Sequence, residues 1–150
     1  MPARVIVRAM RRGDREAALN LWTEAWQSAY PAIDFAARRP WMDARFDELA
    51  RAGARLYAAT VGGRVAGFVT IDPESGYLDQ LVVARAQQRR GIAGMLLARA
   101  RQVCPQRIDL DVNQDNCPAV AFYRKHGFTV TGTGRAPLSG APTYRMTWRG

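Results

Sequence analysis

The sequence predicts a mixed α/β fold with about seven strands and four helices, and three observations support this prediction. Short β-branched or apolar runs alternate along the chain with segments whose apolar residues recur at helical spacing. Two strand-like runs flank Gly62-Gly63, which is typical of a hairpin with a two-residue turn. Between residues 77 and 112 a strand-like run, a glycine loop, a helical segment and a second strand-like run follow one another, which predicts a parallel βαβ unit.

Length and composition favour one domain spanning residues 1–150. The chain is 48% hydrophobic, which is enough for one sizeable core, and no apolar run approaches the length of a membrane span. Its first residues show no signal-peptide pattern, and Cys104 and Cys117 do not make a disulfide framework. We therefore expect a cytoplasmic protein with no membrane partner, either a monomer or a homodimer.

Arginine dominates the charge of the chain. The net charge is +9, and Lys125 is the only lysine among 22 basic residues. These residues are scattered, so they either aid solubility or attract an anionic molecule. Because no recognised nucleic-acid motif is present, a nucleic-acid partner is not expected.

The N-terminal half predicts one strand, two helical regions and the hairpin. Asp14 is a suitable N-cap for the first helix, and Tyr30-Pro31 ends it because a residue before proline avoids the α region. The expected elements are a strand at 5–9, a helix at 15–29, a helical region at 34–52 broken near Arg39-Pro40, and strands at 55–61 and 64–71.

The C-terminal half continues with a strand at 77–83, in which alternation places Asp79 on one face with Leu81 and Val83. The helix that follows ends before Pro105, and its expected apolar face is Ile92, Met95, Leu96, Ala100 and Val103. The remaining elements are a strand at 107–112, a short helix at 117–126 capped by Asn116 and ended by Gly127, a strand at 128–131, a glycine-rich loop at 132–142 and a strand at 143–148.

Residues 88–97, QRRGIAGMLL, predict an anion site at a helix N-terminus. Gly91 and Gly94 let the backbone approach a ligand closely and turn into the helix. The first helical turn has unpaired N–H donors and a partial positive charge, which suit a pyrophosphate, and Arg89 and Arg90 add charge. A turn that binds nothing is the alternative. No Gly-Lys-Ser/Thr follows, so a P-loop does not fit, and the glycines lie too late in the chain for a dinucleotide fold.

Two motifs resemble those of the GCN5-related N-acetyltransferases. Gln88, Gly91 and Ala93 match the acetyl-CoA loop, in which Gln or Arg precedes Gly-x-Gly/Ala, and residues 116–128, NCPAVAFYRKHGF, match the block that follows it. The resemblance covers residues 78–128. It implies the acyl-CoA N-acyltransferase fold, with a mixed, mostly antiparallel central sheet, and direct transfer of an acetyl group from acetyl-CoA to a primary amine.

The resemblance also implies which residues contact acetyl-CoA. Leu81, Val82 and Val83 would offer backbone groups to the pantetheine arm. Asn116 would bind the pantetheine or only cap its helix, and Phe122 would touch CoA or pack in the core. The loop residues that would hold the pyrophosphate are Gln88, Arg89, Arg90, Gly91, Ile92, Ala93 and Gly94.

For catalysis, the resemblance points to Tyr123 as the general acid, because a thiolate leaving group needs a proton; core packing is the alternative. Carboxylates in the strand of Asp79 often serve the family as base, although Asp79 can also anchor the amine or be a polar strand residue. His126 suits the last turn of its helix, where a cation is favourable, and Cys117 is not needed as an acetyl carrier. One histidine and two cysteines without ligand spacing predict no metal.

The acceptor amine stays unidentified. Trp26 and Tyr30, together with Trp41, either pack helices on the sheet or line an acceptor pocket, and residues 29–41 and 132–143 are the loops expected to select the acceptor. Two other functions stay open: a non-catalytic acyl-CoA sensor of the same fold, and acetylation of a protein N-terminus or a charged tRNA.

Overall fold

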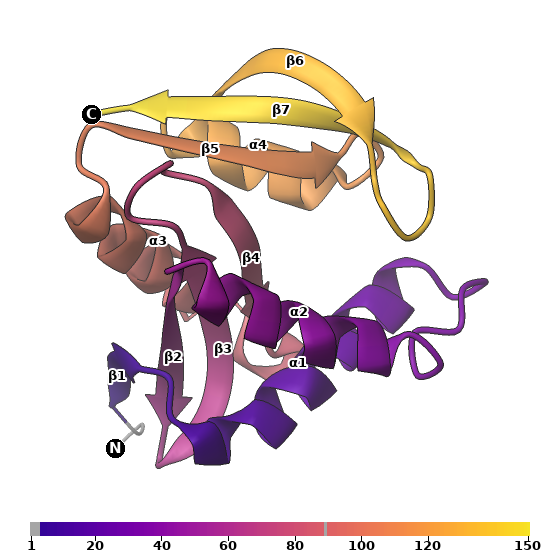
Figure 1. Ribbon diagram of the computed structural model, residues 1–150, viewed down its shortest axis with the longest axis vertical. Coiled ribbons are helices and arrows are strands. Elements are labelled where there is room, and N and C mark those ends of the chain that lie inside the picture. The colour runs from indigo at the N-terminus through magenta and orange to yellow at the C-terminus, as the bar shows by residue number, and fades with distance from the viewer. Residues whose placement is uncertain (1–3, 89) are drawn as a thin grey trace.

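The computed structural model describes residues 4–88 and 90–150, which form seven strands and four α-helices (Figure 1). The strands are β1 (Val5–Ala9), β2 (Arg55–Val61), β3 (Arg64–Ile71), β4 (Leu78–Val83), β5 (Arg107–Asn113), β6 (Thr129–Arg135) and β7 (Pro142–Arg149). The helices are α1 (Arg15–Ala29), α2 (Arg39–Arg51), α3 (Ile92–Val103) and α4 (Cys117–Lys125).

The strands form two antiparallel sheets, ordered β1-β2-β3-β4 and β5-β7-β6. One parallel bridge, Tyr77 to Asp109, joins them, and the Asp109 amide donates to the Gly76 carbonyl at 3.0 Å. A Cβ at residue 76 would lie 2.6 Å from the carbonyl oxygen of Arg107, so glycine permits this junction. Beyond it β4 and β5 diverge (Figure 1), so the mixed, mostly antiparallel fold is confirmed, and the predicted parallel unit is limited to one bridge.

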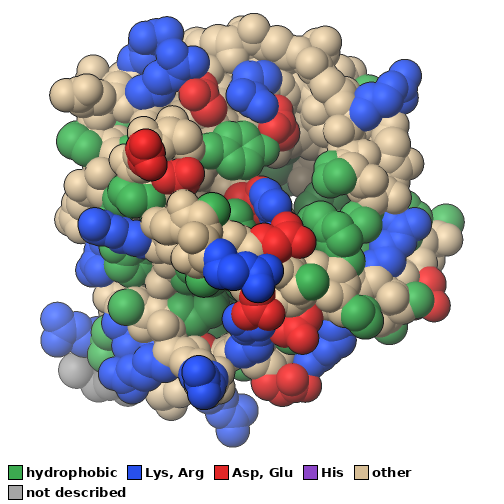
Figure 2. All heavy atoms as spheres, in the orientation of Figure 1, with side chains coloured by type: hydrophobic (Ala, Val, Ile, Leu, Met, Phe, Trp, Pro, Cys, Tyr) green, Lys and Arg blue, Asp and Glu red, His purple; other side chains and the backbone are tan. Residues whose placement is uncertain are grey.

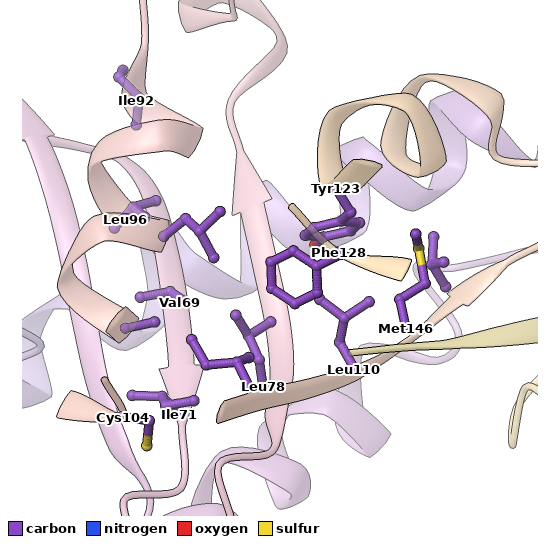
Figure 3. Packing of buried hydrophobic residues seen from close by; sticks show 14 of the residues in the cluster. Val69, Ile71, Leu78, Ile92, Leu96, Cys104, Leu110, Tyr123, Phe128 and Met146 are labelled. Atoms are coloured by element: carbon purple, nitrogen blue, oxygen red, sulfur yellow. The ribbon is translucent and has the colours of Figure 1, made fainter. Parts of the chain in front are cut away.

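Two apolar clusters cover the two faces of the first sheet. On one face, α3 packs through Ile92, Leu96 and Leu97, in a cluster that continues between the two sheets to Phe128 and Met146 (Figure 3). On the other face, α1 and α2 pack against β3 and β4 in a second cluster. Its fully enclosed large side chains are Trp22, Met42, Phe46 and Phe68. The first sheet is therefore a middle layer between α3 and the α1–α2 pair.

Most predicted elements are confirmed, with four local corrections. The carboxylate of Asp14 does not cap α1; it accepts from Arg8 Nη1 and Nη2 at 2.6 and 3.0 Å and from the Arg11 amide at 2.7 Å. Helix α2 begins only at Arg39, after a turn. Met95 is 40% exposed, whereas Leu97 is buried. The second sheet extends β6 to Arg135, which shortens the predicted loop, because antiparallel pairing with β7 continues to the Arg135–Pro142 pair.

Candidate active site

The glycine loop forms the predicted turn into α3. Gly91 occupies the N-cap position with φ +75° and ψ 11°, the left-handed conformation that glycine adopts readily. A Cβ there would meet no atom within 4 Å, so the space beside the backbone is open. The Met95 amide donates to the Gly91 carbonyl at 3.0 Å, so the amides of the first turn precede the first helical hydrogen bond and are available to an anion.

The other loop residues surround this turn. Gln88 and Arg90 are exposed, Ala93 and Gly94 are half-buried, and Ile92 is buried and anchors the helix in the core. Arg89 lies outside the described residues. His126 borders the same turn, since a Cβ on Gly94 would lie 3.9 Å from His126 Cε1. Burial, Arg101 and Lys125 lower the pKa of His126, which favours the neutral ring.

Strand β4 provides an edge beside this loop. It pairs with β3 along one side, and on its other side the described residues pair with β5 only at the Tyr77–Asp109 bridge. Leu81 and Val83 pack against the cluster beneath α3, which is the larger cluster, while Val82 is buried in the second cluster, beneath α1 and α2. The backbone between the bridge and Val83 therefore forms a strand edge that an extended ligand can pair with.

A β-bulge at Asp79 corrects the predicted face of this carboxylate. Thr70 pairs with Gln80 and Ile71 with Leu78, so Asp79 is an extra residue without a partner on β3. A bulge shifts the alternation of side chains by one residue. Leu78 therefore shares its apolar face with Leu81 and Val83, and the prediction that Asp79 shares that face is wrong.

The Asp79 carboxylate instead contacts helix α2. Its Oδ1 accepts from Arg45 Nη2 at 2.7 Å, and its Oδ2 accepts from Arg45 Nε at 3.3 Å and from Gln80 Nε2 at 3.2 Å. Arg45 also donates to Glu48 at 3.2 Å, and hydrogen bonding to Asp79 raises the pKa of Arg45. Only 11% of the Asp79 side chain is exposed, so this carboxylate is held within a polar network.

Helix α4 carries the second motif that the sequence predicted. Asn116 Oδ1 accepts from the Ala119 amide at 3.4 Å, so it caps α4 as predicted. Tyr123 is buried in the larger cluster with its ring 5.4 Å from that of Phe128 and 5.3 Å from that of Phe122, and Figure 3 shows it above Phe128. Burial raises the pKa of Tyr123 well above its usual range, so the phenol stays protonated.

A pocket of about 460 Å³ opens where the second cluster reaches the surface, and Figure 2 shows a hollow bordered by hydrophobic and charged side chains. It combines an aromatic wall with charged groups from distant segments. Its lining includes Trp22, Trp26, Tyr30, Phe35 and Trp41 from α1, α2 and the loop between them; Arg45 and Glu48 from α2; Tyr77, Asp79 and Gln80 at β4; Asp111 and Asn113 from β5; and Arg135, Leu138 and Thr143 at the β6–β7 hairpin.

Tyr30 ties the aromatic wall to the end of β5. Its hydroxyl donates to Asp115 Oδ1 at 2.6 Å and accepts from Asn113 Nδ2 at 2.8 Å. Burial and the hydrogen bond to Asp115 raise the pKa of Tyr30. Its ring lies 5.7 Å from that of Trp26, close to parallel. Both predicted acceptor residues are thus held in place at the pocket.

The structure brings together some predicted residues and separates others. Trp26, Tyr30 and Asp79 line one pocket, whereas Tyr123 packs in the other cluster. Sequence reasoning missed Arg45, which has no local signal. It also missed Asp111 and Asn113, although alternation along RIDLDVN places these polar residues on one face.

Residues 4–88 and 90–150 hold neither a metal cluster nor a membrane-spanning helix. In this part of the chain, no group of three His, Cys, Asp or Glu side chains is arranged to hold a metal ion. None of its helices is long and apolar enough to cross a membrane.

Comparison with known proteins gives consistent matches. The profile of the Acetyltransferase (GNAT) family matches residues 15–128. The chain is 30% identical to the peptidyl-lysine N-acetyltransferase YiaC of Escherichia coli K12, over 95% of this chain and 96% of the relative. It is 32% identical to the L-amino acid N-acetyltransferase AaaT of the same organism, over 57% of this chain and 59% of the relative.

The fold matches a solved structure as well. The PaiA N-acetyltransferase from Thermoplasma acidophilum, crystallised in complex with coenzyme A, superposes with a TM-score of 0.82 at 17% identity, covering 98% of this chain and 99% of that one. At this identity the match concerns the fold alone.

Proposed function

Because this chain belongs to the GNAT family and is an acetyl-CoA-dependent N-acetyltransferase, we propose that its acceptor is the side-chain amine of a lysine in a peptide or protein. The similarity to a peptidyl-lysine N-acetyltransferase along almost the whole chain is the observation that carries this choice of acceptor. An open pocket lined by Trp26, Tyr30 and Asp79 supports it, because aromatic faces hold an alkyl-ammonium chain and a carboxylate attracts its charge.

Acetyl-CoA would lie along β4 and α3 in this proposal. The open left-handed turn at Gly91 and the free amides of the first turn of α3 fit a pyrophosphate. The edge of β4 from Leu81 to Val83 offers backbone groups to the amides of the pantetheine arm. Asn116 uses its carbonyl oxygen for capping, which leaves its amide nitrogen for the same arm. Phe122, on the same helix, is partly buried against the larger cluster.

Residues of the chain would then move protons at the attacking amine and at the departing sulfur. The free amine attacks the thioester carbonyl carbon, the C–N bond forms, and the C–S bond breaks. Tyr123, protonated in its buried setting, donates its proton to the departing sulfur. Before the attack, Asp79 attracts the lysine ammonium from the pocket side, and one ammonium proton leaves to this carboxylate or through it to water. After the attack the nitrogen loses its second proton to water as the amide forms, and Tyr123 regains a proton from water once the thiol has left. Since Arg45 already holds Asp79, we assign anchoring of the amine as its first role.

The free amine of an amino acid is a second candidate acceptor. Its support is the similarity to an L-amino acid N-acetyltransferase, which covers just over half of this chain. The aromatic wall of the pocket suits a small acceptor as well as a lysine side chain. We also propose a single domain and, from the two unpaired cysteines, a cytoplasmic location.

A thiol-release assay tests the acceptor. The protein and acetyl-CoA are combined either with lysine peptides whose N-terminus is blocked or with free amino acids, and the product is identified by mass spectrometry. Because Cys117 is exposed and reacts with thiol reagents, a sample without acceptor is subtracted. Acetylation of the lysine side chain is the expected result. Turnover of free amino acids alone would favour the second candidate, and binding of acetyl-CoA with no turnover of any amine would favour the sensor.

A further inference from the structure

A second hollow, of about 430 Å³, adjoins the acceptor pocket on the face of the β5-β7-β6 sheet. Three residues, Asp111, Arg135 and Thr143, line both hollows. The two therefore border one another at these residues, and an acceptor whose amine lies in the first can extend toward the second. The rest of the second hollow consists of Gly132, Thr133, Gly134 and Arg145.

The glycines of β6 keep this hollow open. A Cβ on Gly132 would lie 3.4 Å from Cβ of Arg145, and a Cβ on Gly134 would lie 3.3 Å from Oγ1 of Thr143. Side chains at these two positions would thus stand on the face that Arg145 and Thr143 occupy. Their absence leaves room above a strand that otherwise carries threonines.

The charges of the second hollow do not cancel. Asp111 accepts from Arg145 Nε and Nη2 at 2.8 and 3.1 Å and from the Tyr77 hydroxyl at 2.6 Å, so both of its carboxylate oxygens are already hydrogen-bonded. Arg135 donates to the Gly140 carbonyl at 2.9 Å, and among the described residues it contacts no carboxylate. Arg135 therefore lines both hollows and carries a positive charge that no carboxylate of the described residues neutralises.

The position of β6 favours an extended acceptor. In the described part of the chain, β6 pairs with β7 and forms the outer strand of its sheet. An extended peptide advances roughly 3.3 Å per residue, so three residues on either side of a lysine span roughly 10 Å in each direction. A guanidinium group there matches a carboxylate in shape and charge.

We propose that the second hollow binds an acidic side chain of the acceptor peptide, within three residues of the target lysine, and that Arg135 determines this preference. This inference rests on the proposed lysine acetyltransferase function. Arg135 is exposed, so the expected gain is that of a surface ion pair. An effect of about fivefold in kcat/KM corresponds to the upper end for such pairs.

The test uses pairs of peptides that each contain one lysine. The two peptides of a pair differ at one position, where one carries Glu and the other Gln, and the pairs cover every position from three residues before the lysine to three after it. The wild-type protein should acetylate the Glu peptide about fivefold faster at one position at least, and raised salt should reduce the ratio. Arg135→Gln should bring the ratio close to one, and Arg135→Glu should favour a peptide with Arg at the same position. Arg149→Gln, an exposed arginine of the same sheet outside both hollows, is the matched control and should keep the wild-type ratio.

The two proposals fail in different ways in this experiment. A wild-type ratio near one at every position, or a ratio that Arg135→Gln leaves unchanged, overturns the role of the second hollow while lysine acetylation stands. Absence of turnover with every lysine peptide overturns the acceptor assignment itself, and the inference with it. Unfolding temperatures of the variants show whether a lost ratio comes from a damaged fold.

Discussion

The proposed donor side and the proposed acceptor side of this enzyme are built in different ways. The proposed donor side is made by one stretch of chain: the end of β4, the glycine turn at Gly91 and the first turn of α3, with α4 beside it. Most of its recognition groups are backbone amides, and the side-chain amide of Asn116 adds one more. The proposed acceptor pocket is made by side chains from α1, α2, β4, β5 and the β6–β7 hairpin, which are far apart in sequence.

This difference explains how each side can vary. Backbone amides at a helix N-terminus bind an anion whatever the side chains are, provided that glycine allows the turn. The acceptor pocket depends on individual pairs such as Arg45 with Asp79 and Tyr30 with Asp115. Substitutions on the donor side should therefore affect acetyl-CoA or chemistry for every acceptor, whereas substitutions in the pocket should change acceptor affinity.

The largest expected effect is that of Tyr123→Phe, which should lower turnover about a hundredfold, the lower end for a lost general acid. The ring stays between Phe122 and Phe128, so acetyl-CoA affinity and stability should change little. Steady-state kinetics and calorimetry measure the two quantities. Tyr57→Phe, which removes a hydroxyl on β2 beside Arg99, is the matched control. Equal turnover of the two variants would assign Tyr123 to packing alone.

Gly91→Glu should weaken acetyl-CoA binding more than tenfold, because it places a negative charge beside the pyrophosphate and removes hydrogen bonds of about 1.5–3 kcal/mol each. The control is Gly53→Glu. Gly53 also has a positive φ, and a Cβ added there would meet no atom within 4 Å, but it follows the end of α2. Both variants carry the same kind of backbone strain, so calorimetry of the pair isolates the effect on the ligand. Similar affinities in the two variants would contradict the donor site.

The sequence allowed prediction of the glycine turn and of the cap of α4 because their signals are local. Glycine spacing, the cap at Asn116 and helical periodicity each concern a few neighbouring residues, and the bounds of β1, α1, β2 and β3 followed from the same kind of pattern. The face of Asp79 was mispredicted because a bulge depends on pairing with β3, which alternation within one strand does not reveal. Arg45 was missed because its role exists only when α2 crosses β4.

Asp79→Asn should raise the KM of the acceptor about tenfold, the effect of losing one charge-assisted hydrogen bond, and leave turnover at saturation within about threefold. Arg45 and Gln80 can still contact the amide oxygen, so the pocket should keep its shape. Asp43→Asn, which alters an exposed carboxylate on α2 that pairs with Arg15, is the control. A fall in turnover with unchanged KM, together with a pH–rate profile shifted toward the free amine, would make Asp79 the base instead.

Tyr30→Phe should have the smallest kinetic effect, because it removes a link between the aromatic wall and the end of β5 and no group that touches the reacting atoms. Asp115 loses a donor, and the buried Asn113 amide loses an acceptor, so the free energy of unfolding should fall by about 1–2 kcal/mol. The aromatic stack with Trp26 remains, and we expect acceptor KM to rise about threefold with acetyl-CoA affinity unchanged. A weakened acetyl-CoA affinity would show that the two sides are coupled through Tyr30.

The pH dependence of stability tests the same hydroxyl. Burial and Asp115 raise the pKa of Tyr30 in the folded protein, so the folded state binds this proton more tightly than the unfolded state. The resulting stabilisation is complete below the unfolded pKa of about 10 and is lost as the pH rises from there through the folded pKa. The stability difference between wild type and Tyr30→Phe, measured by urea unfolding, should therefore shrink as the pH is raised from about 8 to about 11. A constant difference would mean that the hydroxyl stabilises the pocket only by packing.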